Sequence, residues 1–101
     1  MKKLGIISDM KRIAVLLTGR ERHSEGLRMA AGLSLLDDKV DIYLIDDDFT
    51  GKDLPVIEKH LDMIRAAGIG LYSNFKKDDF IFTAASDLGK KLSEYDYVIP
   101  Y

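Results

Sequence analysis

Short apolar runs alternate along the chain with stretches of helical periodicity. Residues 13–18 form a nearly continuous apolar run, which is typical of a strand covered on both faces in a parallel sheet. A helix should begin at Ser24, because its hydroxyl group can accept a hydrogen bond from an amide of the first turn. The helical spacing of Leu27, Ala30 and Ala31 predicts the buried face of this helix.

Two glycines lie within this predicted helix, although glycine weakens helices by up to ~1 kcal/mol relative to alanine. We therefore expect Gly26 and Gly32 to let the helix approach the sheet closely. Leu35 would extend the buried stripe toward the end of the helix.

The same alternation continues to the carboxyl end of the chain. Residues 40–45 are rich in β-branched and aromatic side chains and predict a second strand. A second helix should have Asp53 as its N-cap and Pro55 in its first turn, and should end at Gly68 in the left-handed conformation. The remaining predicted elements are strands at residues 69–73, 80–82 and 97–99 and a last helix with the apolar stripe Ala85, Leu88 and Leu92.

This order of strands and helices predicts the fold class. Strands that alternate with helices favour an open, mainly parallel sheet with right-handed crossovers and helices on its faces, an α/β fold. The 101 residues suffice for one compact domain with a small core. Residues 1–10 could form a short extra strand or a tail, and the sequence supports both interpretations.

Composition excludes several classes of function. The formal net charge is -2 with acidic and basic residues interspersed, so we expect neither nucleic acid nor a membrane as a partner. No apolar run approaches the ~20 residues of a membrane-spanning helix, and residues 4–7 are too short for a signal sequence, which favours a cytoplasmic protein. Cysteine is absent, which excludes disulfides, thiolate zinc sites, persulfide carriers and cysteine nucleophiles.

The topology indicates where a ligand would bind. In open parallel sheets, ligands bind outside the carboxyl ends of the strands. Residues 18–24, 46–49 and 73–77 follow three predicted strands and should meet there. The candidate ligand-binding residues are Thr18, Gly19, Arg20, Arg22, His23, Ser24, Asp46, Asp47, Ser73 and Asn74.

The segment at residues 18–24 supports two interpretations. Amides at a helix N-terminus, together with Arg20, Arg22 and His23, could hold a phosphate or a sulfur oxyanion. However, the segment has no glycine-rich nucleotide motif, so a solvated turn is the favoured interpretation. His23 could act as an acid or base near neutral pH, but a lone loop histidine is usually just exposed. We therefore assign no catalytic residue.

Two further groups of side chains leave alternatives open. Residues 46–48 are all aspartate and would suit a hard cation, but successive strand residues point to opposite faces, so we favour a hydrated strand end and predict no metal and no cofactor. Aromatic residues crowd the last third of the chain, where they could cover a subunit contact or pack under the last helix. They are Phe75, Phe80, Phe82, Tyr95, Tyr97 and Tyr101.

The segment KRIAVLLTGRERHSEGLRMAAGLSLLDDKVDIYLIDDDF and the ending SEYDYVIPY resemble the DsrE/DsrF-like family, small α/β proteins linked to sulfur relay. The resemblance covers residues 11–99. It implies a DsrEFH-like three-layer α/β/α fold with about five mainly parallel strands, and a homo-oligomer that is a trimer or a hexamer. Sulfur-transferring members carry a reactive cysteine just after the third strand. Ser73 or Asn74 occupies that region here, and a serine hydroxyl cannot carry a persulfide.

Three functional hypotheses follow. The leading one is a non-catalytic, cytoplasmic DsrE-like homo-oligomer that binds a small anionic ligand or a protein partner. The alternative is an enzyme or binder that acts on a small phosphate or sulfur oxyanion through residues 18–24. A third hypothesis is a subunit whose cysteine-bearing homologue performs the sulfur chemistry.

Overall fold

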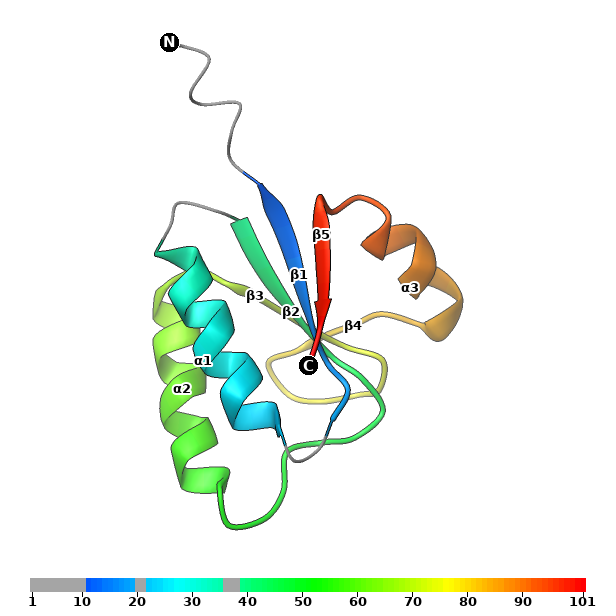
Figure 1. Ribbon diagram of the computed structural model, residues 1–101. Helices are drawn as coiled ribbons and strands as arrows, with labels where there is room; N and C mark the ends of the chain where they lie inside the picture. Colours follow the sequence, from blue (N-terminus) through cyan, green and yellow to red (C-terminus); the bar gives the residue numbers. More distant parts are fainter. Residues whose placement is uncertain (1–10, 20–21, 36–38) are drawn as a thin grey trace, which may run out of the picture.

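A computed structural model describes residues 11–19, 22–35 and 39–101 of the chain. The extra strand or tail predicted at residues 1–10 lies outside the described residues. Every pair of neighbouring strands is parallel, which confirms the predicted α/β fold with a parallel sheet (Figure 1). The elements are β1 (Arg12–Leu17), α1 (His23–Ser34), β2 (Lys39–Leu44), α2 (Leu54–Ala66), β3 (Gly70–Ser73), β4 (Ile81–Phe82), α3 (Ala85–Leu92) and β5 (Tyr97–Pro100).

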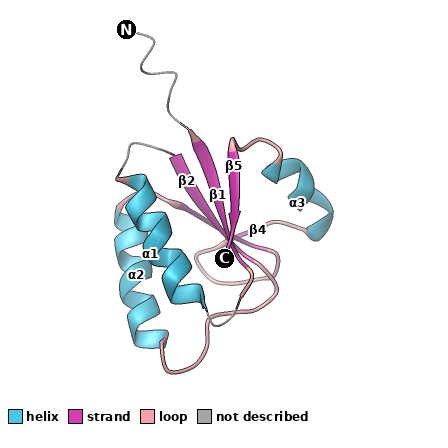
Figure 2. Cartoon of the chain, viewed as in Figure 1, coloured by secondary structure: helices cyan, strands magenta, loops and turns pink. Residues whose placement is uncertain are grey.

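The order of the strands explains the three layers. Within the described residues the sheet has the order β4-β3-β2-β1-β5. The chain therefore moves in one direction from β1 to β4 and then returns past β1 to form β5. Because crossovers between parallel strands are right-handed, this reversal places the intervening helices on opposite faces. Figures 1 and 2 show α1 and α2 side by side on one face and α3 on the other.

The hydrophobic core lies between the sheet and the layer formed by α1 and α2. Val15, Ile42 and Leu71 are aligned across β1, β2 and β3, so their side chains point to the same face. Phe49 and Phe80 close the core at the carboxyl ends of the strands. The buried apolar side chains of this cluster are Ile13, Val15, Leu17, Leu27, Ala30, Val40, Ile42, Leu44, Phe49, Ile57, Leu61, Ile64, Ile69, Leu71 and Phe80.

Helix α1 approaches the sheet closely at one of its two glycines. A Cβ atom at Gly26 would collide with Leu17 Cδ2, so only glycine fits there without displacing that side chain. No heavy atom lies within 4 Å of a Cβ atom built at Gly32, and the expected close approach at that residue is therefore wrong. Leu35 is 82% exposed because it follows the last helical residue, so it does not extend the buried stripe.

The N-cap of α1 lies two residues before the predicted one. The helix begins at His23, with Arg22 rather than Ser24 in the N-cap position. The Arg22 amide donates to the Gly19 carbonyl at 2.8 Å, and this turn places the chain in helical geometry before Ser24 is reached. The side chain of the N-cap residue makes no capping hydrogen bond.

The boundaries of α2 agree with the sequence. Asp53 occupies the N-cap position and Pro55 lies in the first turn, although the Asp53 carboxylate makes no capping hydrogen bond. Gly68 has a φ angle of 79°, the left-handed conformation that ends helices. Helix α3 contains no buried residue. Its predicted apolar stripe is therefore only partly covered, with Leu88 and Leu92 half-buried and Ala85 exposed.

Candidate functional site

The ends of β2 and β3 are joined by a reciprocal pair of hydrogen bonds. The Asp46 amide donates to Asn74 Oδ1 at 2.7 Å, and Asn74 Nδ2 donates to Asp46 Oδ1 at 2.8 Å. Asp46 adopts a φ angle of 68°, a left-handed conformation that aspartate tolerates better than most residues. Two of the candidate residues are therefore bonded to each other.

A second contact joins the same two segments. Lys77 Nζ lies 2.8 Å from Asp48 Oδ1. The ammonium group also lies over the rings of Phe49 and Phe80, 5.4 and 5.5 Å from their centroids, where it is attracted by the ring electrons. The lysine thus covers the end of the core.

His23 connects the loop after β1 to the segment after β2. Its ring meets Phe49 edge to face, with centroids 5.0 Å apart and an angle of 89°. The side chain is only 2% exposed, so the expectation of an exposed loop histidine is wrong. The cause is the earlier start of α1, which turns His23 toward the core in the first helical turn.

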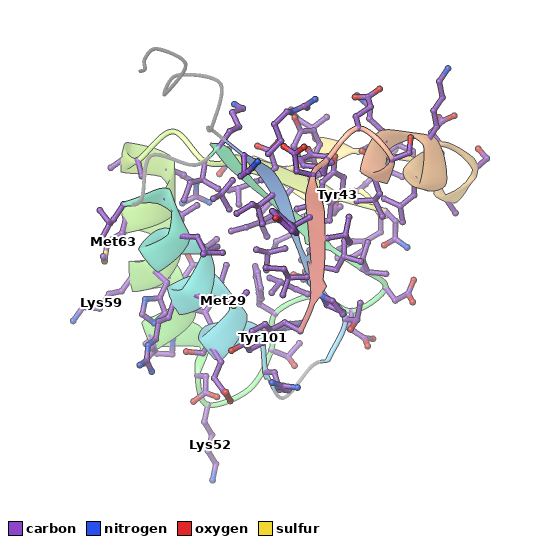
Figure 3. The ribbon with its side chains drawn as sticks, turned by 45° about the horizontal axis from the view of Figure 1, so that its top comes forward. Met29, Tyr43, Lys52, Lys59, Met63 and Tyr101 are labelled. Carbon is purple, nitrogen blue, oxygen red and sulfur yellow. The ribbon has the colours of Figure 1, made fainter. Side chains whose placement is uncertain are left out.

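Three of the candidate residues, Thr18, Gly19 and Arg22, contact Tyr101. The amides of Thr18 and Gly19 both donate to the Tyr101 carbonyl, at 3.1 and 3.0 Å. The Arg22 guanidinium carbon lies 4.6 Å from the centroid of the Tyr101 ring. Figure 3 shows Tyr101 at the end of β5 beside α1. Arg20 lies outside the described residues, and Ser24 is half-buried in the first turn.

The end of β3, where the resemblance would place a reactive cysteine, holds a buried serine. Ser73 is fully buried, and its hydroxyl donates to the carbonyl of Phe75. Its own carbonyl accepts a hydrogen bond from the Thr83 amide at 2.8 Å.

Among the candidate residues after β2, the Asp47 amide donates to the Ile45 carbonyl at 2.8 Å. The three loops therefore meet as expected, whereas ligand binding by their residues stays a prediction.

The aspartates after β2 do not assemble into a cation site. Asp46 bonds to Asn74, while Asp48 lies against Lys77, so the two carboxylates have separate partners. Within residues 11–19, 22–35 and 39–101, no group of three or more histidine or acidic side chains is placed to hold a metal ion.

Sequence reasoning missed a polar network on the opposite face. Asp41 is 3% exposed, and its carboxylate accepts hydrogen bonds from the Tyr95 hydroxyl at 2.6 Å and from the Gly70 amide at 3.2 Å. Because the Tyr95 proton points to Asp41, Tyr95 accepts the hydrogen bond that joins it to the Tyr43 hydroxyl at 3.0 Å. Glycine is required at position 70, since a Cβ atom there would collide with Asp41 Oδ1. Figure 3 places Tyr43 on the side of the strands away from α1 and α2.

Aromatic contacts extend this network, and burial changes the pKa of its tyrosine hydroxyl groups. Tyr72 stacks on Tyr43 with centroids 4.8 Å apart, and the Arg12 guanidinium lies over the Tyr95 ring. Burial raises the pKa of Tyr43 and of Tyr72 above the ordinary value. Burial, followed by the hydrogen bond to Asp41, raises the pKa of Tyr95 still further. The Tyr43 and Tyr95 hydroxyl groups donate the hydrogen bonds of this network, and their raised pKa values extend its protonated form to higher pH.

A hollow of about 480 Å³ adjoins this network between α3 and the strands β3 and β4. Its lining includes the half-buried Tyr72 and the exposed Ile81 and Phe82. Another hollow of about 430 Å³ lies beside the start of α1 and Tyr101. Thr18, Gly19, His23 and Ser24 line neither of them.

The helices of the described ranges are too short or too polar to cross a membrane. Comparison of the chain with protein-family models, with curated proteins and with solved structures found no match. The resemblance to the DsrE/DsrF-like family therefore rests on the residues quoted above and stays a prediction.

Proposed function

We propose that this protein is a non-catalytic, DsrE-like binding or accessory protein that works as a homo-oligomer, either a trimer or a hexamer. One observation carries the proposal: the histidine and the serine at the carboxyl ends of the strands are buried, and the carboxylates Asp46 and Asp48 are bonded to neighbouring side chains. Asp46 bonds to Asn74, Lys77 covers Phe49, and His23 is buried. A catalytic acid, base or nucleophile needs access to a substrate, and burial withholds that access from His23 and Ser73.

The last residue of the third strand supports a role beside sulfur chemistry rather than in it. Sulfane transfer requires a thiolate that can form and pass on a persulfide. Ser73 has a hydroxyl group, and that group is buried and bonded to the Phe75 carbonyl. An accessory subunit that binds a cysteine-bearing homologue would need no thiol of its own.

Exposed apolar side chains support assembly. Ile81 is 58% exposed and Phe82 is 53% exposed, although both are large, and both line the hollow beside α3. Large apolar side chains that are exposed together on a protein surface often mark a site where another molecule binds. The adjoining helix α3, which buries none of its residues, adds to the same surface.

Two measurements on the purified chain test this function. Light scattering at micromolar concentration should give the mass of a trimer or hexamer, whereas a monomer would contradict the proposal. After treatment with polysulfide and removal of small molecules, mass spectrometry should show no bound sulfur. An Asn74→Cys variant, which introduces a single thiol beside Ser73, is the positive control for persulfide detection.

Purification from cell extracts separates the two accessory roles. A tagged chain that returns only copies of itself is a homo-oligomer that acts without a related subunit. A tagged chain that returns a cysteine-bearing homologue in fixed proportion supports the role of a partner subunit in sulfur relay.

The alternative function, binding of an oxyanion through residues 18–24, has less support because Thr18, Gly19 and Arg22 contact Tyr101. We expect phosphate, sulfate and thiosulfate to leave the amide NMR signals of Gly19 and Arg22 unchanged. Saturable shifts of these signals would favour the alternative instead. If one of these oxyanions proved to be turned over, loss of that turnover in the variant His23→Ala would assign the reaction to an enzyme that uses His23.

A further inference from the structure

The surface beside α3 has an apolar centre that a single chain leaves exposed. Tyr72, Ile81 and Phe82 line the hollow of about 480 Å³ between α3 and strands β3 and β4. Helix α3 covers this side only partly, because Leu88 and Leu92 are half-buried and no residue of the helix is fully buried. In Figure 1, α3 lies on the face of the sheet opposite α1 and α2.

Charged side chains of α3 and of the turn after it line the same hollow in balanced number. Asp87 and Glu94 carry negative charge, Lys90 and Lys91 carry positive charge, and all four line the same hollow. None of the four takes part in an ion pair described within residues 11–19, 22–35 and 39–101. Each is exposed, so each is available to a partner that covers the hollow.

We propose that this surface, the α3–β4 patch (Tyr72, Ile81, Phe82, Asp87, Lys90, Lys91 and Glu94), binds the same patch of a second copy of the chain about a two-fold axis. In a two-fold contact one surface meets itself, so it must be self-complementary in charge. Two acidic and two basic residues beside an apolar centre meet that requirement. A ligand of one sign would instead be repelled by half of the rim.

This two-fold contact rests on the proposed function, which allows a trimer or a hexamer. It decides between these two assemblies. A two-fold contact joins subunits in pairs, so the chain forms an even-numbered assembly. A hexamer fits, because it can be built from three such pairs, whereas a simple trimer with a three-fold axis contains no such contact.

The other edge of the sheet lacks these features and provides a control. Tyr97 is 55% exposed and Val98 is also exposed, but β5 contains no charged residue. Neither residue lines the hollow beside α3. Pro100 has no amide hydrogen, which limits the pairing of another strand along this edge.

Charge exchange tests the contact directly. The double variant Lys90→Glu/Lys91→Glu makes the rim wholly acidic, and Asp87→Lys/Glu94→Lys makes it wholly basic. Each variant alone should show half the number of subunits of the unmodified chain in sedimentation experiments, because like charges face each other across the axis. An equimolar mixture should regain the original number. Circular dichroism melting curves verify that each variant is folded.

The outcomes separate failure of the patch from failure of the proposed function. Variants that keep the original mass, or a mixture that stays at half of it, would overturn the two-fold contact while leaving an oligomer in place. A monomeric unmodified chain would overturn the oligomer as well. Phe82→Lys should also halve the assembly, whereas Tyr97→Lys, a change of similar size on β5, should leave it unchanged; equal effects of these two changes would likewise overturn the contact.

Discussion

The two faces of the sheet are completed in different ways. On the face toward α1 and α2, side chains such as Val15 and Ile42 are fully buried among other apolar groups. On the face toward α3, the buried groups include Asp41 and Tyr43, which are held by hydrogen bonds, and Ile81 is more than half exposed. Hydrophobic burial within one chain stabilises the first face. The second face depends on a polar network and, in our proposal, on another copy.

The largest difference between the faces should appear when a buried leucine is truncated. Leu61 on α2 is 1% exposed, so Leu61→Ala should lower the free energy of unfolding by about 2–5 kcal/mol. Leu88 on α3 is half-buried, and Leu88→Ala should cost less than about 2 kcal/mol. Urea denaturation of both variants at low protein concentration provides the comparison. Equal losses would show that α3 is packed as firmly as α2.

The polar network should respond next most strongly. Tyr95→Phe removes the hydroxyl group that donates to Asp41 and leaves a buried carboxylate with one partner fewer. The expected loss in unfolding free energy is about 1–3 kcal/mol. The matched control is Tyr97→Phe, because that tyrosine is mostly exposed. Similar losses of unfolding free energy for the two changes would show that the hydrogen bond from Tyr95 to Asp41 does not stabilise the fold.

Alkaline pH should weaken the face toward α3 selectively. The pKa of Tyr95 is raised in the folded chain by burial and by the hydrogen bond to Asp41, and the pKa of Tyr43 is raised by burial. The folded state therefore holds these protons more tightly than the unfolded state. Their contribution to stability is complete below the unfolded pKa of about 10 and is lost as pH rises above it.

Urea denaturation at about pH 8 and about pH 11 measures this loss, since the two values lie on either side of the ordinary tyrosine pKa. Tyr95→Phe should reduce the pH dependence of the unfolding free energy, because one raised pKa is removed. Tyr97→Phe corrects for the other groups that titrate in this range. A pH dependence that is unchanged in Tyr95→Phe would argue against a raised pKa at that residue.

The smallest effect should occur at the carboxyl ends of the strands, which belong to neither face. Asn74→Ala removes the hydrogen bonds to Asp46 and should lower the unfolding free energy by about 0.5–1.5 kcal/mol. Lys76→Ala, a change at an exposed residue of the same loop, should leave it nearly unchanged. A shift of the Asp46 amide signal in the NMR spectrum of Asn74→Ala would locate the change.

Local sequence patterns predict the covered face well. Residues 13–18 form an apolar run because that strand is covered on both sides, and the run indicates a parallel sheet without any tertiary information. Pro55 and Gly68 mark the ends of α2 because their backbone restrictions act within the residue itself. The same kind of local reasoning is right about a close approach at Gly26 and wrong about one at Gly32.

The other face and the site depend on contacts between distant residues, which local patterns do not contain. Tyr95 and Asp41 are 54 positions apart, and the only local signal is an acidic residue between Val40 and Ile42. The turn after β1 is closed by Tyr101, which requires β5 to lie beside β1. For this reason the burial of His23 could not be predicted, although the meeting of the three loops could.

Sedimentation equilibrium of the unmodified chain at micromolar concentration tests the central claim most directly, namely that a second copy completes the face toward α3. We predict an assembly with an even number of subunits. A hexamer would agree with both the family resemblance and the two-fold contact. A single species with the mass of one chain would contradict this prediction.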